Sequence, residues 1–248
     1  MPNVAKLHAV PVRPMESMTW NDELQPQLLE SARYAVLRRI GPALRHQIAG
    51  SLQPMSMMSS MVERRIQMEA PDLGGLRKNC AEMSGLARSA SSECVALMGW
   101  LAPPEKDAVA LGEAVDDCLH LLSTEFSFRG FTIVNEVGER ELPVSRNAVR
   151  TVLTAVLMAL SDAANEPGEL HLTADVSERA ATLIVAMKNE QGDTEPSKAK
   201  AYRELSWKEV ELLAHAERVA LRSTAQGTQM VFEVLETKPR DGADVRWG

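Results

Sequence analysis

His46 is the residue whose type and position most favour chemistry at a surface. It stands inside a ladder of apolar residues that advances by three or four positions, as the buried stripe of an α-helix does. The ladder is Ile40, Leu44, Ile48, Leu52, Met55, Met58, Val62 and Ile66. At about 100° per residue, His46 lies about 200° from both Leu44 and Ile48 and therefore faces away from the stripe. An exposed imidazole is largely neutral near pH 7, so this ring is predicted to be an accessible nucleophile.

The residues beside His46 on that outward face are small or compact, namely Pro42, Ala43, Ala49 and Gly50. Gly50 costs about 1 kcal/mol relative to alanine inside a helix, and close approach of another molecule would explain its presence. The residues predicted to contact such a partner are Arg45, Ala49, Gly50 and Gln53. The alternative interpretation is that His46 is only a solvated side chain.

Other chemically interesting groups are weaker. Asp116, Asp117 and His120 fall within one helical turn and could ligate a metal, but carboxylates beside a histidine are common on solvated helices, so no metal site is predicted. His171 and His215 have no partners at an interpretable spacing.

Composition limits the classes of function. The 248 residues are enough for two domains, and the net charge of −7 argues against nucleic acid, which requires clustered Lys and Arg. The pairs Arg38-Arg39 and Arg64-Arg65 are interpreted as solvated helix faces. No signal peptide or apolar run near 18 residues is recognisable, so we expect a cytoplasmic protein without membrane contact. Three cysteines, Cys80, Cys94 and Cys118, lack a C-x-x-C spacing and are interpreted as core residues.

Two long helices are expected in the first half of the chain. Residues 1–27 contain several prolines and are predicted to form a flexible arm. Residues 28–102 are predicted to form a helical hairpin, with a helix from Leu28 to Met68 that begins or bends at Pro42, and a turn at residues 69–75.

The second predicted helix carries a heptad-like seam. Its members are Leu73, Leu76, Cys80, Met83, Ala87, Ala90, Cys94, Leu97 and Leu101. Because a hairpin cannot cover both of its own apolar stripes, we expect a homodimer with a four-helix bundle. The alternative is that the C-terminal half of the chain covers the stripe.

The second half mixes helices and strands. Residues 106–237 are expected to form an α/β sandwich, a mixed sheet with helices on one face, and residues 238–248 a tail. The expected helices are Val109 to Phe128, Ser145 to Ala164 and Ser206 to Leu221. The expected strands are 131–137, 170–176, 182–187 and 230–235. The whole chain is therefore assigned to the α+β class.

These pieces together resemble the catalytic region of sensor histidine kinases over about residues 28 to 236. Arg45-His46 and Leu52-Gln53 are similar to that family's phosphoacceptor box on a dimerisation hairpin, and "FTIVNEV", "LPVSRNAVRTVLTAVLMALSDAA", "GELHLTADV", "ATLIVAM" and "AQGTQMVFEVL" are similar to its ATP-binding domain. The resemblance implies that His46 carries phosphate.

The departures from that family fall on residues used for ATP. Gln47 stands where an acidic base is usual, and Asp162 and Met158 stand at the metal-binding positions. The adenine box reads Lys188-Asn189-Glu190-Gln191-Gly192-Asp193, where Asn189 or Asp193 could substitute for the usual aspartate, and residues 194–208 contain no glycine with which to cradle phosphates. No bound cofactor is therefore expected. If a nucleotide does bind, Asp162 and Gly227 are its predicted contacts.

The expected function is a phosphate relay through His46 to or from the aspartates of response-regulator receiver domains. The receiver is expected to supply Mg²⁺. A hybrid histidine kinase is a further partner that this function would allow. The first alternative is an active ATP-dependent histidine kinase with a divergent pocket. The second is a non-catalytic dimeric pseudokinase scaffold.

Overall fold

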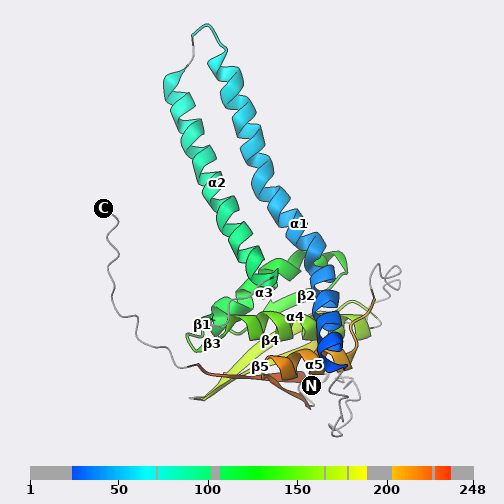
Figure 1. Cartoon of the computed structure of the whole chain (residues 1–248). Helices are drawn as coiled ribbons and strands as arrows, with labels where there is room; N and C mark the ends of the chain where they lie inside the picture. Colours follow the sequence, from blue (N-terminus) through cyan, green and yellow to red (C-terminus); the bar gives the residue numbers. More distant parts are fainter. Residues whose placement is uncertain are drawn as a thin grey trace, which may run out of the picture.

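A helical hairpin stands on a body of helices and strands (Figure 1). The computed structural model describes residues 24–70, 72–101, 107–164, 166–177, 179–188, 203–224 and 227–235. The hairpin consists of α1 (Gln25–Ile66) and α2 (Leu73–Leu101). The hairpin and the α+β class are thus confirmed. Residues 1–23 of the expected arm, residues 102–106 between the expected hairpin and the expected sandwich, and the expected tail at 238–248 lie outside the described residues.

Helix α1 is longer and more continuous than the prolines suggested. It begins at Gln25, so residues 25–27 belong to the helix and not to the arm, and Pro26 sits in the first turn, where a missing N–H costs no helical bond. The expected start at Pro42 does not occur, because the helix runs through this proline. Ile40, two residues earlier, is fully buried, and packing of this kind offsets the bond lost at Pro42 because tertiary contacts supply most helix stability.

The turn of the hairpin is short. Helix α2 begins at Leu73, the first member of the expected seam, so residues 73–75 of the expected turn are helical. Asp72 Oδ1 accepts a hydrogen bond from the Gly75 N–H at 3.1 Å near the first turn. The interpretation of the cysteines as core residues is correct for Cys118 and wrong for Cys80 and Cys94, which are exposed on α2. Two helices cover only one stripe of each other, so seam residues outside that stripe stay at the surface.

The body contains a five-stranded mixed sheet with strand order β2-β4-β5-β7-β6. Its strands are β2 (Thr132–Asn135), β4 (Glu169–Val176), β5 (Ala180–Lys188), β6 (Ala220–Thr224) and β7 (Gly227–Glu233). The β2–β4 pair is parallel and the remaining pairs are antiparallel. Two short strands, β1 (Ala108–Ala110) and β3 (Pro143–Ser145), pair separately.

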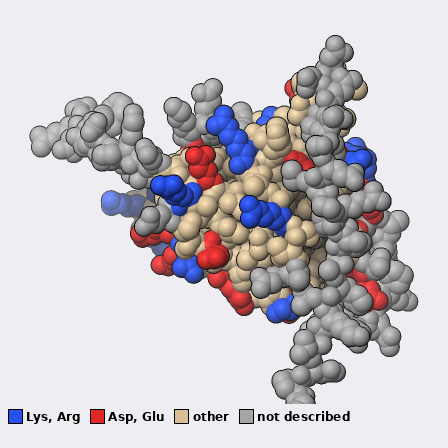
Figure 2. Space-filling model, turned by 90° about the horizontal axis from the view of Figure 1, so that it is seen from below, with Lys and Arg blue, Asp and Glu red and all other residues tan. Residues whose placement is uncertain are grey.

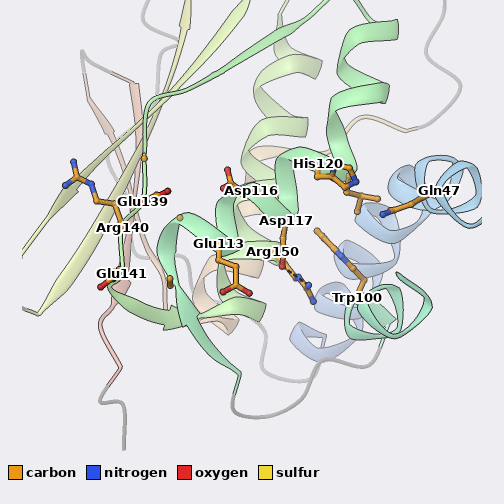
Figure 3. Close-up of a pocket in the computed structure, with 14 residues that line it drawn as sticks. Gln47, Trp100, Glu113, Asp116, Asp117, His120, Glu139, Arg140, Glu141 and Arg150 are labelled. Carbon is orange, nitrogen blue, oxygen red and sulfur yellow. Dashed lines mark hydrogen bonds and ion pairs between the residues drawn. The ribbon is translucent and has the colours of Figure 1, made fainter. Parts of the chain in front are cut away.

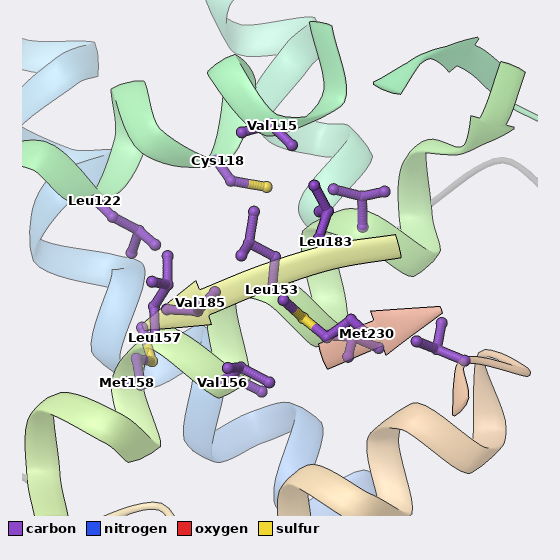
Figure 4. Close-up of a cluster of buried hydrophobic side chains, with 14 of the residues drawn as sticks. Val115, Cys118, Leu122, Leu153, Val156, Leu157, Met158, Leu183, Val185 and Met230 are labelled. Atoms are coloured by element: carbon purple, nitrogen blue, oxygen red, sulfur yellow. The ribbon is translucent and has the colours of Figure 1, made fainter. Parts of the chain in front are cut away.

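Three helices cover one face of this sheet: α3 (Leu111–Phe128), α4 (Arg146–Ala163) and α5 (Trp207–Ala216). Alternate residues of β5 and β7 are buried, as expected for strands with helices on one side only. Figure 4 shows the resulting core between α3, α4, β5 and β7, where Leu153, Leu157, Leu183 and Met230 are fully buried. In Figure 2, seen from below, acidic and basic side chains are interspersed on the visible surface.

Several boundaries differ from expectation. Helix α5 ends at Ala216 and not at Leu221, because Arg218 adopts a left-handed backbone (φ 58°) that stops the helix. The residues after it form β6, a strand that the sequence analysis missed. Strands β1 and β3 were also missed, since three residues are too few to display an alternating pattern. None of the helices among the described residues is long and apolar enough to cross a membrane.

The first half of α1 belongs to the core of the body. Ala32, Val36 and Ile40 join the same buried cluster as α3, α4 and the sheet. The division into a hairpin at 28–102 and a sandwich at 106–237 stays a prediction, but one helix packs in both regions. The hairpin therefore projects from the sandwich only beyond about Leu44, which is half-buried against this core.

Candidate functional site

His46 lies near the middle of α1, and its side chain is exposed. Leu44 and Ile48, on either side of it in sequence, are half-buried. This confirms the outward direction that the apolar ladder predicted. Along the helix, His46 lies about 9 Å beyond Ile40, at about 1.5 Å per residue, so the imidazole comes shortly after the point where α1 leaves the sandwich.

The residues predicted to meet a partner are on the surface as well. Arg45, Ala49, Gly50 and Gln53 are all exposed. A Cβ built on Gly50 would meet no atom within 4 Å, so no contact within this protomer requires a glycine there. The approach of a second molecule as the reason for Gly50 stays a prediction, and the surface around His46 is open to one.

A cleft of about 550 Å³ lies between the hairpin and the sandwich (Figure 3). Gln47, the residue after His46, lines it from α1, and Trp100 lines it from the end of α2. The sandwich contributes Ala110, Gly112, Glu113, Asp116, Asp117, His120, Leu121, Gly138, Glu139, Arg140, Glu141 and Arg150. The helical turn that carries His46 therefore also forms part of the cleft wall.

The acidic residues of the cleft are engaged with different donors. Asp117 accepts hydrogen bonds from Arg146 Nη1 and, at 3.0 Å, from Arg150 Nη2. Asp116 accepts one at 2.9 Å from the side-chain amide of the last residue of β2. His120 is exposed. The three residues considered for a metal are thus not assembled into a centre, and the part of the chain that the structure describes has no group of three or more His, Cys, Asp or Glu placed to hold one.

Arg150 joins the base of α2 to the sandwich. Its guanidinium carbon lies 5.4 Å from the centre of the Trp100 ring, and a Cβ on Gly99 would lie 2.8 Å from Arg150 Nη1. Arg150 is buried, so this cation–π contact is largely shielded from water. A glycine at position 99 lets α2 approach the guanidinium closely.

Asp162, the conditional nucleotide contact, is buried at the other end of α4 and held by two arginines. Arg39 Nη1 donates to its Oδ2, and Arg39 Nη2 donates to its Oδ1 at 3.1 Å. Arg129 Nη2 also donates to Oδ1 at 3.0 Å, and the Leu205 N–H donates to Oδ2 at 3.1 Å. Both carboxylate oxygens are therefore occupied by donors from the chain itself.

Arg39 corrects the sequence analysis, which placed it on a solvated helix face. Arg39 is 5% exposed. Its Nη2 lies 3.6 Å from Glu125 Oε1, and the same guanidinium group also pairs with Asp162. Burial raises the pKa of Glu125 even though Arg39 and Arg129 oppose that shift. The sequence held a signal for this position, because Arg39 follows Val36 by three residues on the face that becomes buried.

Two remaining candidates, His171 and Gly227, lie on the interior strands β4 and β7 of the sheet. Gly227 has φ 134°, and a Cβ there would lie 2.4 Å from the Val185 carbonyl oxygen, so close approach of β7 to β5 accounts for this glycine. His171 does have a partner, contrary to expectation: its Nε2 lies 2.8 Å from Glu169 Oε2. Residues two apart on a strand share a face, which is the signal that was missed. Residues 189–202, with most of the expected adenine box and lid, lie outside the described residues.

Comparison with known proteins gave structural likenesses only. No protein-family model matches the chain, and no curated protein sequence matches it. Among solved structures it is similar to Acinetobacter baumannii histidine kinase AdeS, with 13% identity, a TM-score of 0.38 and coverage of 76% of this chain and 95% of that chain. It is also similar to a bacterial phosphotransferase, with 14% identity, a TM-score of 0.37 and coverage of 87% and 98%.

A third likeness is to histidine kinase ThkA in complex with response regulator protein TrrA. It has 15% identity, a TM-score of 0.35 and coverage of 88% of this chain and 67% of that chain. At such values the likenesses do not assign the chain to a family. Its function is therefore argued from the residues described above.

Proposed function

We propose that this chain acts in two-component signalling by carrying a phosphoryl group on His46. The observation that supports this most is an exposed imidazole on the open face of α1, with small exposed residues around it. In the proposed step, an imidazole nitrogen attacks the phosphorus of an aspartyl phosphate in a receiver domain. A P–N bond forms, the P–O bond to the aspartate breaks, and the carboxylate leaves. The reverse step passes the group to another receiver.

The magnesium ion in this step belongs to the receiver, where it offsets the charge on the phosphoryl oxygens. The chain itself then needs no nucleotide. Two features support a relay over the alternative of an ATP-dependent kinase: Arg39 and Arg129 engage Asp162, and strand packing accounts for Gly227. An imidazole nitrogen that attacks with its lone pair also needs no base at Gln47.

A homodimer is part of this proposal. The hairpin exposes large apolar side chains along both of its helices, and a second hairpin would cover those on the side away from His46. The exposed residues are Leu52, Met57, Met61, Ile66, Leu73, Val95, Met98 and Leu101. Further proposed partners are receiver domains and a hybrid histidine kinase upstream.

The test is a pair of incubations of the full chain, one with a panel of ³²P-phosphorylated receiver domains and one with ³²P-labelled Mg-ATP. We expect label to pass from receivers to the wild-type chain and to be lost in His46→Ala. His120→Ala is the matched control, because His120 is also an exposed helical histidine. This control should keep at least about half of the label, since no step of the proposed transfer uses His120.

Three results would overturn the relay through His46. Label that reaches His46 from Mg-ATP assigns the chain to the kinases. Absence of label from every receiver, together with full signalling by His46→Ala in cells, assigns it to the scaffolds. Label that persists in His46→Ala places the acceptor elsewhere.

A further inference from the structure

Helix α1 packs against the end of the sandwich that carries Asp162. Arg39 reaches from the hairpin helix into the body and forms two contacts with Asp162, although 123 positions separate them in sequence. The side chains of Arg39 and Asp162 are 5% and 4% exposed. A pair this deeply buried is shielded from solvent and salt, unlike an ion pair at a surface.

The charges around the pair are balanced within the chain. Arg129 donates to Ser161 Oγ and to Asp162 Oδ1, each at 3.0 Å, and Glu125 lies beside Arg39 at 3.6 Å. Two guanidinium groups therefore face two carboxylates. Removal of Arg39 would leave the buried Asp162 and the half-buried Glu125 with only Arg129 beside them, which is costly because a buried charge without a partner has lost its hydration.

Apolar contacts surround this cluster. Ala32 and Ile40 are fully buried against the sandwich, and Val36 is nearly so. At the rim, Arg33 pairs with Glu217 at 3.1 Å and stays half exposed. On the other helix of the hairpin, the Trp100–Arg150 contact fixes the base of α2. The hairpin is thus attached to the sandwich through both of its helices.

We infer that Arg39 is a positioning residue, a built-in cation that locks the sandwich onto α1 in one orientation beside His46. Because the lock is formed by the chain alone, it goes beyond the proposed phosphotransfer and holds whether or not His46 carries phosphate. Its consequence is that the sandwich does not swing as a separate lobe. Any group transferred to His46 is then delivered by another molecule, which meets a rigid surface made of hairpin and sandwich together.

The lock can be measured by the reactivity of a thiol placed within it. Val36→Cys is a small change at a buried position of the junction, introduced into a chain whose exposed thiols are removed by Cys80→Ser and Cys94→Ser. The buried thiol of Cys118 stays as an internal reference for opening of the whole body. Modification of the two thiols is followed by peptide mass spectrometry after timed exposure to N-ethylmaleimide.

With Arg39 intact, we expect the thiol at position 36 to react nearly as slowly as Cys118. Arg39→Met should accelerate it at least about 30-fold and leave Cys118 within about twofold, since loss of one partner of a buried pair destabilises the contact strongly. Arg33→Met is the matched control: it removes an ion pair across the same junction, but an exposed one, and should change the rate less than about threefold.

Three results would overturn the inference. The first is fast modification at position 36 with Arg39 intact, and the second is an unchanged rate in Arg39→Met. If Arg39→Met accelerates both thiols together, Asp162→Asn decides, because it removes the charge and keeps the side-chain shape. If Asp162→Asn accelerates modification at position 36 alone, the result supports the lock. If it accelerates modification at position 36 and at Cys118 together, the result contradicts the lock. None of these readouts depends on phosphate, so failure of the relay and failure of the lock are distinguishable.

Discussion

The two halves of α1 share one helix and one apolar period but have different surroundings. In the first half Ala32 and Ile40 are fully buried by the sandwich. In the second half Leu52 is 47% exposed and Ile66 is 59% exposed. His46 lies just past the boundary between them. The difference shows that a helical stripe identifies a face that needs a partner, whereas the partner itself depends on the rest of the fold.

The two halves of α1 also differ in what they contribute to the surroundings of His46. The docked half fixes the position of the imidazole relative to the sandwich, through Arg39 and the apolar cluster. The projecting half offers surfaces to other molecules. Under the proposed function, the docked half would hold His46 in place while the projecting half would bind a second copy of the chain.

The sharpest test of the comparison replaces the same residue type in each half. Ile40→Ala should lower the free energy of unfolding by about 2–5 kcal/mol, because it leaves a cavity in the core. Ile66→Ala should change it by less than about 0.5 kcal/mol in a dilute, dissociated protomer. Urea titrations followed by circular dichroism measure both. Equal losses at the two positions would show that the halves are covered alike.

The second prediction concerns association. Leu52→Asp should raise the dimer dissociation constant by at least about 100-fold, because an unpaired carboxylate would enter an apolar interface, and should leave the protomer folded. Gln53→Asp, one position along on an exposed site, is the control and should have little effect. Sedimentation equilibrium gives the constants. A Leu52→Asp protein that dimerises as tightly as the wild type contradicts the proposed bundle.

The third prediction concerns the pH dependence of stability that arises from the buried thiol of Cys118. Burial raises the pKa of the Cys118 thiol from 9.0 to about 12, outweighing the opposing effect of Arg150. The stability contributed by this protonated thiol is present below the unfolded value and is lost as pH rises toward 12. Between pH 8 and 10 the wild type should therefore lose about 1 kcal/mol more than Cys118→Ala. Denaturant titrations at the two pH values measure that difference.

At pH 8, alkylation of the folded protein should reach the exposed thiols of Cys80 and Cys94 and spare Cys118. Equal labelling of all three thiols in the folded protein would show that the body opens as readily as the hairpin surface.

The smallest change in stability is expected for Glu209 in α5, the helix against which α1 packs. Burial acts to raise the pKa of Glu209, but hydrogen bonds from Arg203 and Ser206 outweigh it and the pKa is lowered. This contribution is present above the ordinary carboxyl range and is lost as pH falls through the lowered pKa. Glu209→Gln should cost about 0.5 kcal/mol at pH 7 and almost nothing near pH 3, after allowance for solvent screening. Thermal unfolding at both pH values checks this.

Much of the local structure could be predicted because its signals are local. The period of apolar residues predicted both long helices, and alternation predicted β4 and β5 close to their observed bounds. Strand β6 was missed because the helical pattern of residues continues through it, and only the left-handed backbone of Arg218 ends the helix. Such a backbone conformation leaves little trace in residue types, since arginine rarely adopts it.

The sequence by itself determined the α+β class, the hairpin and the outward direction of His46, since each follows from the spacing of neighbouring residues. Only the tertiary structure decided that the first half of α1 belongs to the core and that Arg39 meets Asp162. A helical period states which residues share a face. It contains no information about a partner 123 positions away, because that contact exists only when the sheet and its helices have brought the two segments together.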